Sequence, residues 1–384
     1  MKLVQQLNAR VRGWLFSRLS TRLLKFFGTT TVDVHGATVI LPALTFSIRE
    51  FGMNRLQQET YKFPLGIISD GGFDGVHDHG AFRWSIFNNA FVSGNGRVLD
   101  SRARLILDSV ASHRQKVTNP GWLRAASARR TEGTILNLNW WPGTGNIFHW
   151  NRDVLSRAFV LTCESRPPAV TLVVPEGLLE YQRHAVERLV SIFPDCEWRT
   201  QAFDEWRRAD SVIVPSTHPY PVGSGFLHPE VADFVREVNT HLVPNASQDV
   251  RVLFVSRRKS KHRRVLDEDN LISALQKVSA VSVAYLEDLS YEQQMSLMQS
   301  VDILVGPYGA GLTHILFTRR RGLLEIHNGD SQETHFSTLA LACRSPYVQV
   351  RGSNSNAQQD FTLGPNGIES VCEALERLIQ LGFS

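Results

Sequence analysis

The sequence predicts an α/β protein of two lobes with a strand-rich N-terminal section. Its 384 residues exceed what one ordinary hydrophobic core accommodates. From about residue 135 onward, short apolar runs alternate with amphipathic stretches, which is typical of parallel sheets covered by helices. This rhythm occurs twice, on either side of the turn-rich segment 242–250. We therefore expect a basic amphipathic helix at residues 1–30, an N-terminal lobe at 31–245 and a C-terminal lobe at 246–384.

The composition argues against several classes of protein. With 42% hydrophobic and 20% charged residues, the chain has the balance of a soluble globular protein. No apolar run approaches the roughly 18 residues that are needed to span a bilayer. The four cysteines show no paired spacing, so neither a disulfide framework nor a zinc site is predicted. These features fit a reducing cytosol.

Positive charge gathers in two segments of an otherwise acidic chain. Residues 1–28 contain six Lys or Arg and no acid, and residues 251–264 contain seven more, again without an acid. Removing these thirteen from the 41 basic residues leaves 28 against 37 acids, a balance of −9 for the rest. A phosphate-bearing ligand, nucleic acid or an anionic membrane could each pair with such segments.

The first basic segment, residues 1–28, has the pattern of an amphipathic helix, because its apolar side chains recur at helical spacing. A cleavable signal peptide is not predicted, since these apolar residues are periodic rather than continuous. Two alternatives stay open: the helix docks on its own domain, or it lies in an anionic membrane interface. We expect a cytoplasmic protein, peripheral on the inner face of the cytoplasmic membrane if the second alternative holds.

Local patterns predict the elements of the first lobe. Residues 37–48 favour a strand pair, and residues 84–101 favour strands around a Gly-Asn-Gly turn. Pro229 falls in the first turn of a predicted helix, where its missing amide donor costs little. The remaining patterns predict strands at 171–175 and 211–215 and helices at 177–193 and 228–242.

The second lobe repeats the rhythm more cleanly. Its predicted strands are 251–256, 281–286, 302–306, 322–328 and 347–351, and its predicted helices are 267–278, 290–300, 310–318, 333–343 and 367–383. In such sheets, ligands bind at the carboxyl ends of the strands and between lobes.

A glycine-rich corner, Gly306-Pro-Tyr-Gly-Ala-Gly311, connects a predicted strand to a predicted helix. Free backbone N–H groups and the helix dipole favour an anion at such a place. Gly309 and Gly311 carry no Cβ, so a ligand can approach the main chain closely. The corner has neither the Walker spacing nor the dinucleotide-binding spacing. A tight turn that serves packing alone is the alternative.

The second basic segment directly follows the first strand of the same lobe. In a parallel sheet, this loop and the glycine corner open on the same edge. Guanidinium groups facing backbone amides make a diphosphate clamp without a metal, whereas a solvated basic loop is the alternative. The basic and hydroxyl side chains of this loop are Ser256, Arg257, Arg258, Lys259, Lys261, Arg263 and Arg264.

Glu325 ends the predicted strand GLLEI, also on that edge. A carboxylate there can accept two hydrogen bonds from a ribose diol, although a helix cap or a surface carboxylate is the alternative. Together these features predict a nucleotide-diphosphate site. Its candidate residues are Ser256, Arg257, Arg258, Lys261, Arg264, Tyr308, Gly309, Ala310, Gly311, Leu312, Thr313 and Glu325.

The first lobe supplies a candidate general base. His149, Asp153 and Arg157 lie four residues apart, so on a helix they share one face. An imidazole that is oriented and charged by a carboxylate is suited to take a proton. A structural histidine is the alternative. We predict His149 and Asp153 as catalytic residues.

Four motifs in order, NIFHWNRDVLSR, FVSRRKSKHRRVLDEDNL, GPYGAGLTHILF and LLEIHN, resemble glycosyltransferase family 61, in particular its prokaryotic branch of capsule and surface-polysaccharide type. The resemblance covers roughly residues 140–330, about half of the chain. It implies a GT-B fold with two Rossmann-like lobes, an inverting mechanism and no obligatory metal. The family usually has His-Gly-Ala-Gly where this chain has Tyr308-Gly-Ala-Gly311.

The resemblance implies a transferase that moves a sugar from a UDP-sugar donor to a saccharide or glycolipid acceptor. The C-terminal lobe would hold the nucleotide sugar, and no cofactor or metal site is expected. A nucleotide-sugar epimerase of the same fold is the enzymatic alternative. A nucleic-acid-binding protein is a weaker one, because the basic loop follows a buried strand and has few interleaved aromatic residues for base stacking; no nucleic-acid partner is expected.

Overall fold

In the computed structural model, the structure describes residues 82–106, 125, 128–139, 145–215, 227–240, 252–328, 335–353 and 355–382, together with four short strands nearer the N-terminus. The predicted helix at residues 1–30 and the segment 242–250 lie outside the described residues.

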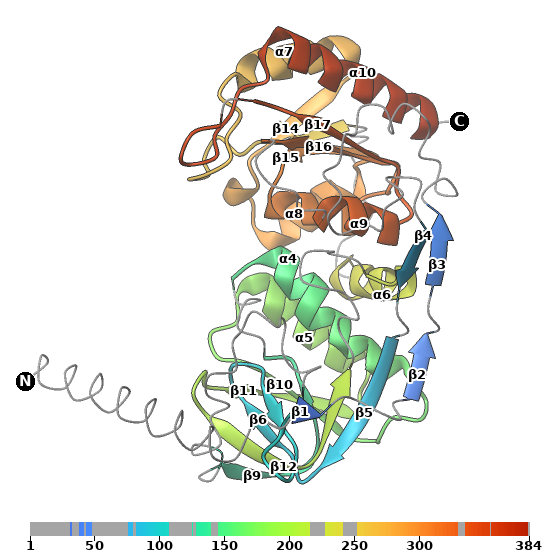
Figure 1. The fold of residues 1–384 in the computed structure, drawn as a ribbon, viewed down its shortest axis with the longest axis vertical. Coiled ribbons are helices and arrows are strands. Elements are labelled where there is room, and N and C mark those ends of the chain that lie inside the picture. Colours follow the sequence, from blue (N-terminus) through green and yellow to red (C-terminus); the bar gives the residue numbers. More distant parts are fainter. Residues whose placement is uncertain are drawn as a thin grey trace, which may run out of the picture.

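A mixed sheet forms the N-terminal half (lower part of Figure 1). Its order is β1-β8-β7-β6-β12-β9-β10-β11, with β5 beside β12 and β2 beside β5. The strands are β1 (Thr31–Val32), β2 (Thr38–Leu41), β5 (Phe82–Asn88), β6 (Phe91–Ser93), β7 (Val98–Leu99), β8 (Leu105–Ile106), β9 (Arg129–Asn137), β10 (Val170–Pro175), β11 (Cys196–Gln201) and β12 (Trp206–Pro215).

This sheet is not the wholly parallel one that the strand–helix rhythm predicts. Strands β12, β9, β10 and β11 run parallel, but β5 and β6 pair antiparallel with β12. Only residues 202–205 separate β11 from β12, and only residues 89–90 separate β5 from β6. The link at 89–90 lets β5 and β6 follow one another along the same side of β12, where β5 pairs with residues 211–215 and β6 with residues 206–208.

The strand pair predicted at residues 37–48 is wrong in its pairing. Both strands form, but β2 pairs with β5, and β3 (Leu44–Ser47) pairs with β4 (Val76–His79) in a separate two-stranded sheet. Pro42 between them explains the outcome, because its ring fixes a negative φ while two-residue hairpins need positive φ. The turn predicted around Gly-Asn-Gly is confirmed: β6 and β7 pair antiparallel across it, and Gly96 has φ 94°.

Helices of the N-terminal half cover the sheet and face the C-terminal half. The predicted helices are confirmed as α5 (Glu180–Ile192) and α6 (Pro229–Thr240). The stretch that carries His149, Asp153 and Arg157, which the sequence analysis treats as helical, is irregular. It consists of a short α-turn, α4 (Ile147–His149), a π-helical turn, η5 (Trp150–Val154), and a 3-10 helix, η6 (Leu155–Thr162).

A five-stranded parallel sheet forms the C-terminal half, as the sequence predicts (upper part of Figure 1). Its order is β14-β13-β15-β16-β17. The strands are β13 (Val252–Val255), β14 (Val281–Ala284), β15 (Ile303–Pro307), β16 (Gly322–His327) and β17 (Tyr347–Arg351); the helices are α7 (Glu268–Val278), η7 (Leu286–Asp288), α8 (Tyr291–Gln299), η8 (Ala310–Leu316), α9 (His335–Ala342) and α10 (Gly364–Gly382). The segment predicted as a helix at 310–318 is the 3-10 helix η8.

Helices cover both faces of this parallel sheet. Helices α7 and α10 pack together over the outer face with their own apolar cluster. Helices α8 and α9 lie on the inner face, where α6 packs against α8, α9 and η8 (Figure 1). The apolar side chains at this junction form one continuous core with those of the N-terminal half.

The strand order places a topological switch point between β13 and β15. The chain moves from β13 outward to β14 and then returns to the other side of β13 as β15. In open α/β sheets, the connections that leave such neighbouring strands diverge at their carboxyl ends and form a ligand-binding crevice. Among the described residues, no helix is long and apolar enough to cross a membrane.

Candidate active site

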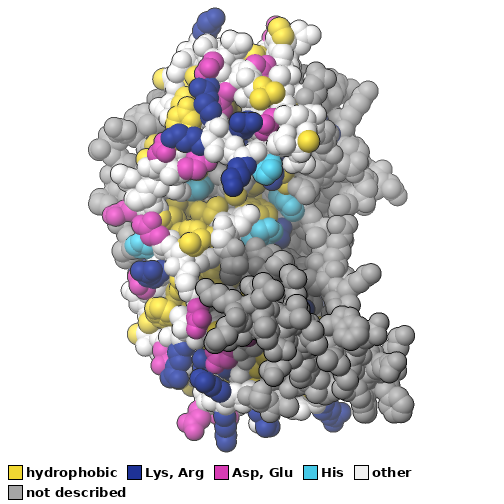
Figure 2. Space-filling model, turned by 90° about the vertical axis from the view of Figure 1, so that its left-hand side faces the viewer, with side chains coloured by type: hydrophobic (Ala, Val, Ile, Leu, Met, Phe, Trp, Pro, Cys, Tyr) yellow, Lys and Arg dark blue, Asp and Glu magenta, His cyan; other side chains and the backbone are white. Residues whose placement is uncertain are grey.

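The basic loop and the glycine corner meet at this switch point. The loop Ser256–Arg264 leaves the carboxyl end of β13, and the corner Tyr308–Gly311 leaves the carboxyl end of β15. Figure 2 shows Lys and Arg side chains mixed with acids over the C-terminal half, above a band of histidine and hydrophobic side chains. The sequence prediction that the two loops share one edge is confirmed.

Arg257 lies directly on the glycine corner. A Cβ added to Gly309 would stand 2.0 Å from Nη1 of Arg257, so the guanidinium occupies the space that a side chain there would need. Nη2 of Arg257 donates to Ser260 Oγ (2.8 Å) and to the His262 carbonyl (3.1 Å). Burial, and next the charge of Arg263, lower the pKa of the Arg257 guanidinium.

Arg263 is absent from the sequence-based list of site residues but lies at the corner. Its guanidinium carbon lies 4.9 Å from the centroid of the Tyr308 ring, a cation–π contact. Its backbone is left-handed, with φ 62°, which is unusual for a residue other than glycine. Its Nε is buried and has no hydrogen-bond partner within the described part of the chain. The sequence shows Arg263 only as one of seven basic residues and contains no signal that ranks it.

Arg257 and Arg263 therefore lie close together at the corner, where the carboxylates of Glu287 and Asp360 are near enough to raise the pKa of Arg257 without forming an ion pair with it among the described residues. Neither Arg257 nor Arg263 forms an ion pair with a carboxylate of the residues that the structure describes. Like charges held together in a partly buried place raise the free energy of the folded protein, and a bound anion would offset this cost. This pair is the strongest indication of an anion site at the switch point.

Most other basic residues of the loop hold the fold together instead. Their positive charges face carboxylates of the same half. Arg258 pairs with Glu268 and Asp269, Lys259 pairs with Asp288, and Arg264 pairs with the buried Asp360 at 2.7 Å.

The sequence predicts Arg258 and Arg264 as residues of the nucleotide-diphosphate site. These ion pairs indicate a structural role for them instead. Because the ion pairs attach the loop to α7 and to the segment before α10, they supply its shape rather than charge for a ligand. Lys261 is exposed.

Ser256 also has an internal role. Its hydroxyl donates to the Glu268 carboxylate at 2.8 Å, and its oxygen accepts the backbone N–H of Arg258 at 3.1 Å. The residue is buried. The hydroxyl expected to contact phosphate is thus engaged in closing the turn after β13.

The glycine corner opens η8 with backbone amides that have no acceptor inside that helix. Gly309 lies against Arg257, and Ala310 and Gly311 follow it at the start of η8. Leu312 and Thr313 are buried, so the chain turns inward immediately after the corner. An anion beside Arg257 would meet backbone donors from one side and guanidinium groups from the other.

Glu325 does not lie where the sequence suggests. Strand β16 continues to His327, so Glu325 is two residues inside the strand and is 1% exposed. Its carboxylate accepts hydrogen bonds from the Tyr347 hydroxyl (2.7 Å) and from Gln349 Nε2 (3.1 Å) of β17. These bonds hold β16 to β17, which corrects the placement of Glu325 at the sheet edge.

The predicted His149–Asp153 pair forms. Nδ1 of His149 lies 2.8 Å from Oδ2 of Asp153, and the histidine side chain is 30% exposed while the aspartate is fully buried. Because the carboxylate can only accept, His149 carries a hydrogen on Nδ1. Arg152, which the sequence analysis overlooked, donates to both oxygens of Asp153, and so compensates the buried charge.

Aromatic contacts connect this pair to the glycine corner. Phe148, next to His149, lies 5.4 Å from the ring of Phe336, and Phe336 lies 5.3 Å from the ring of Tyr308. Helix α4 also packs against η8. The candidate base and the candidate anion site therefore stand on adjoining elements of the two halves.

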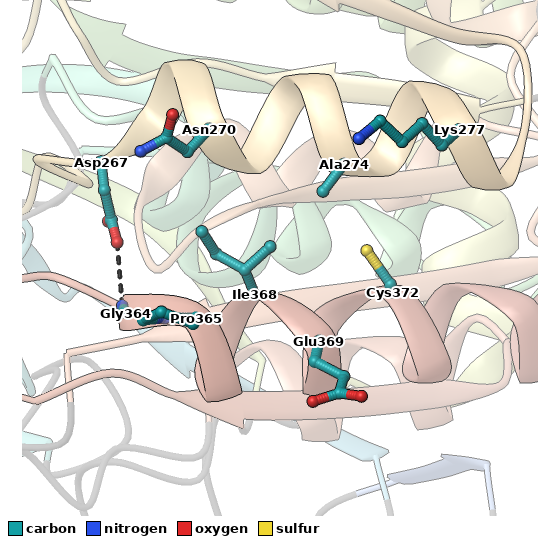
Figure 3. Close-up of a pocket in the computed structure, with 9 residues that line it drawn as sticks. All are labelled: Asp267, Asn270, Ala274, Lys277, Gly364, Pro365, Ile368, Glu369 and Cys372. Atoms are coloured by element: carbon teal, nitrogen blue, oxygen red, sulfur yellow. Dashed lines mark hydrogen bonds between the residues drawn. The ribbon is translucent and has the colours of Figure 1, made fainter.

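A separate pocket of about 570 Å³ lies between α7 and α10 on the outer face. Figure 3 shows Ile368 and Cys372 of α10 directed toward α7. Asp267 accepts the backbone N–H of Gly364 at 2.9 Å and ties the two helices together at one end of the pocket. No candidate site residue lines this pocket. Among the described residues, no group of three or more His, Cys, Asp or Glu is arranged to hold a metal ion.

Comparison with known proteins finds partial relatives of this chain. The chain is 42% identical over 73 residues to an EGF domain-specific O-linked N-acetylglucosamine transferase of Drosophila melanogaster, which covers 18% of this chain and 14% of that protein. It is 31% identical over 117 residues to the Bos taurus protein of that name, covering 29% and 22%. The chain thus spans less than a quarter of the length of these relatives.

The family model described as Glycosyltransferase 61 matches residues 147–323, slightly less than half of the chain. This range begins at α4 and ends in β16, so it includes the His149–Asp153 pair, the arginine loop and the glycine corner. The match supports the resemblance to glycosyltransferase family 61 that the four motifs indicate.

Proposed function

We propose that the protein is a glycosyltransferase that moves a sugar from a nucleotide-sugar donor, UDP-linked, to an acceptor hydroxyl. The observation that carries this proposal is the pair Arg257 and Arg263. It lies without carboxylate partners among the described residues, on a glycine corner at the switch point of a parallel sheet. The match to Glycosyltransferase 61 over the same residues supports the reaction class.

The donor diphosphate would bind between the arginine pair and the amides of Gly309–Gly311. As the bond between sugar and phosphate breaks, negative charge develops on the departing diphosphate. Preorganised guanidinium and N–H groups stabilise such charge without reorganisation at the moment of reaction. These groups would perform the role that a divalent metal has in many transferases, and we propose a metal-independent reaction.

His149 would act as the general base. Asp153 holds Nδ1, so Nε2 is the ring nitrogen that would take the proton from the acceptor hydroxyl. The oxygen would then attack the anomeric carbon from the side opposite the diphosphate, which inverts the configuration at that carbon. Arg152 would continue to donate to Asp153 while the histidine gains its positive charge.

The proposal also covers the arrangement of the two lobes, the donor sugar and the acceptor. We propose a GT-B arrangement with lobes at 31–245 and 246–384, the second of them binding the donor. The relatives' name concerns N-acetylglucosamine and EGF domains, which makes UDP-N-acetylglucosamine the first donor to test. We propose a saccharide or glycolipid acceptor in bacterial surface polysaccharide synthesis, with residues 1–28 at the inner face of the membrane.

The test is a panel of UDP- and GDP-sugars incubated with the purified protein, with and without EDTA. We expect release of UDP from one UDP-sugar, faster with a saccharide acceptor and unchanged by EDTA. In a second set of reactions, an EGF domain replaces the saccharide as acceptor. Conversion of the sugar without an acceptor would favour an epimerase instead. Failure of every nucleotide sugar to bind in calorimetry would contradict the proposal.

A further inference from the structure

Helix α8 carries two polar side chains that extend toward the two parts of the candidate site. Tyr291, its first residue, reaches toward the turn that carries the His149–Asp153 pair. Gln294, one turn later, reaches toward the helix that follows the glycine corner. Both contacts are buried or nearly so, and both cross from α8 to another element.

The first branch is a chain of hydrogen bonds from Tyr291 through Asn239 to Asn151. The Tyr291 hydroxyl bonds to Oδ1 of Asn239, and Nδ2 of Asn239 bonds to Oδ1 of Asn151 at 3.1 Å. Nδ2 of Asn151 bonds to the Ile147 carbonyl at 2.8 Å. All three side chains are buried, so each bond lies in a low-dielectric interior where an unmet polar group is costly.

Two backbone carbonyls fix the direction of this chain. Nδ2 of Asn239 also lies 2.7 Å from the Val235 carbonyl, and a carbonyl only accepts, so this atom must be the amide nitrogen. The Ile147 carbonyl fixes the Asn151 amide in the same way. It follows that Tyr291 donates. Burial raises the pKa of Tyr291 far above its usual range, so the hydroxyl stays a donor at every working pH.

The end of this branch lies inside the turn that holds the candidate base. Asn151 stands between His149 and Asp153 in sequence, on the opposite face of the turn. Its side-chain amide bonds the Ile147 carbonyl just before the chain widens into the π-helical turn η5. Single π-helical turns are frequent at functional sites. The orientation of His149 and Asp153 thus depends on how this turn is held.

The second branch runs from Gln294 through His314 to the glycine corner. Nε2 of Gln294 donates to the carbonyls of Leu286 and Leu289, so its Oε1 faces Nε2 of His314 at 3.0 Å. Nδ1 of His314 lies 2.9 Å from the Gly311 carbonyl. A neutral imidazole has one N–H, so the ring can donate to only one of these two acceptor oxygens.

We propose that α8 is a positioning element, which sets the His149–Asp153 pair and the glycine corner relative to each other through Tyr291 and Gln294. This inference rests on the proposed function for its catalytic meaning. The first branch, Tyr291, Asn239 and Asn151, would affect the reaction by orienting the His149–Asp153 pair. The second branch, Gln294 and His314, would do so by positioning the glycine corner. None of them is placed in contact with the donor.

Tyr291→Phe tests the first branch, because it removes one hydroxyl and keeps the ring. Tyr181→Phe is the matched control: Tyr181 lies 6.0 Å from the Tyr291 ring, and its buried hydroxyl has no hydrogen-bond partner among the described residues. In ¹⁵N-histidine spectra, wild type and Tyr181→Phe should show His149 as the Nδ1–H tautomer. Tyr291→Phe should show a mixture of tautomers and a kcat about tenfold lower, with unchanged affinity for UDP.

Gln294→Met tests the second branch by removing the amide at nearly constant shape. We expect UDP affinity to fall about fivefold while the His149 tautomer stays as in wild type. Identical His149 spectra in Tyr291→Phe and Tyr181→Phe would overturn the first branch, and unchanged UDP affinity in Gln294→Met would overturn the second. The spectra need no turnover, so a wild-type protein without transferase activity would sink the proposed function and leave this test intact.

Discussion

At the scale of single residues, charge compensation separates the side chain that we propose binds an anion from those that support the loop. Arg258 and Arg264 lie in the same loop as Arg257 and look equivalent in the sequence. The first two face carboxylates, whereas Arg257 faces a glycine, a hydroxyl and a backbone carbonyl. A half-buried arginine that forms no ion pair with a described carboxylate has hydrogen-bonding capacity available for an anion.

Arg257→Ala should therefore weaken UDP binding strongly. A charge-assisted hydrogen bond is worth about 1.5–3 kcal/mol, which corresponds to roughly 10- to 150-fold in affinity. Isothermal titration with UDP measures the change. Arg258→Ala is the control, since its partners are Glu268 and Asp269. Equal losses in the two variants would show that the loop as a whole, and not Arg257, determines affinity.

His149→Ala should lower kcat by about 10²–10⁴-fold, the usual contribution of a general base, and leave UDP affinity nearly intact. Asp153→Asn should cost less, because an amide keeps the ring in place but stabilises its charged form poorly. Steady-state kinetics together with titration of UDP separates the two effects. Loss of UDP binding with kcat preserved would instead make His149 a ligand-positioning or structural residue.

His314 should make stability depend on pH. Burial lowers the pKa of His314 to about 4, below its ordinary value of 6.5. Between these values the unfolded chain binds a proton that the folded protein does not, so stability falls as the pH falls through this window, by up to about 3 kcal/mol. Urea unfolding of wild type and His314→Gln at pH 7 and pH 4.5 measures this; parallel losses in both proteins would contradict it.

At the scale of elements, neighbouring side chains leave little space for a side chain at Gly309 and Gly311 of the glycine corner. An added Cβ at Gly309 meets the guanidinium of Arg257, while one at Gly311 meets Cγ1 of Val255 at 3.1 Å. The first contact is with the movable end of a binding side chain. The second is with a fixed core residue and needs a shift of only a few tenths of an ångström.

Gly309→Ala should thus leave the fold intact and displace Arg257, lowering UDP affinity about tenfold or more, on the scale of one charge-assisted hydrogen bond. Gly311→Ala should cost stability while affecting affinity less. Calorimetric titration and thermal unfolding of both variants provide the comparison. A Gly309→Ala protein with wild-type affinity would mean that Arg257 is not held in a binding position by the corner.

The strands and helices also show which parts of the fold and of the candidate site could be predicted from the sequence alone. Hydrophobic periodicity and strand–helix alternation correctly predicted the parallel sheet and placed both loops at one edge. The mixed sheet was missed, because antiparallel pairing of β5 and β6 depends on partners far away in the chain. The importance of Arg263 and Arg152 was missed because it arises from contacts with Tyr308 and Asp153, which no spacing rule encodes.

At the scale of the whole molecule, the halves share a core. The apolar cluster that includes α5 and α6 continues into α8, α9 and η8 without interruption. Separation of the halves would expose this surface to water, at about 25 cal/mol per Å² of apolar area. The described parts of the two halves therefore have a common source of stability.

We expect one cooperative thermal transition rather than two. Residues from both halves lose their burial together when the shared cluster opens, so neither half should melt alone. Differential scanning calorimetry, with tryptophan fluorescence and far-ultraviolet circular dichroism as separate probes, checks the prediction. Transitions at different temperatures for the two probes would contradict it.

The two like charges of Arg257 and Arg263 lower the stability of the folded protein when no anion is bound. The two guanidinium groups are already ordered by Ser260, the His262 carbonyl and the Tyr308 ring, so little side-chain entropy is lost when a ligand arrives. Their mutual repulsion is present in the folded protein, is offset in part by Glu287 and Asp360, and would be offset further by a bound anion. Fitness for binding and resistance to unfolding are thus opposed at this corner, and a variant chosen only for a higher melting temperature would tend to discard one of the two arginines.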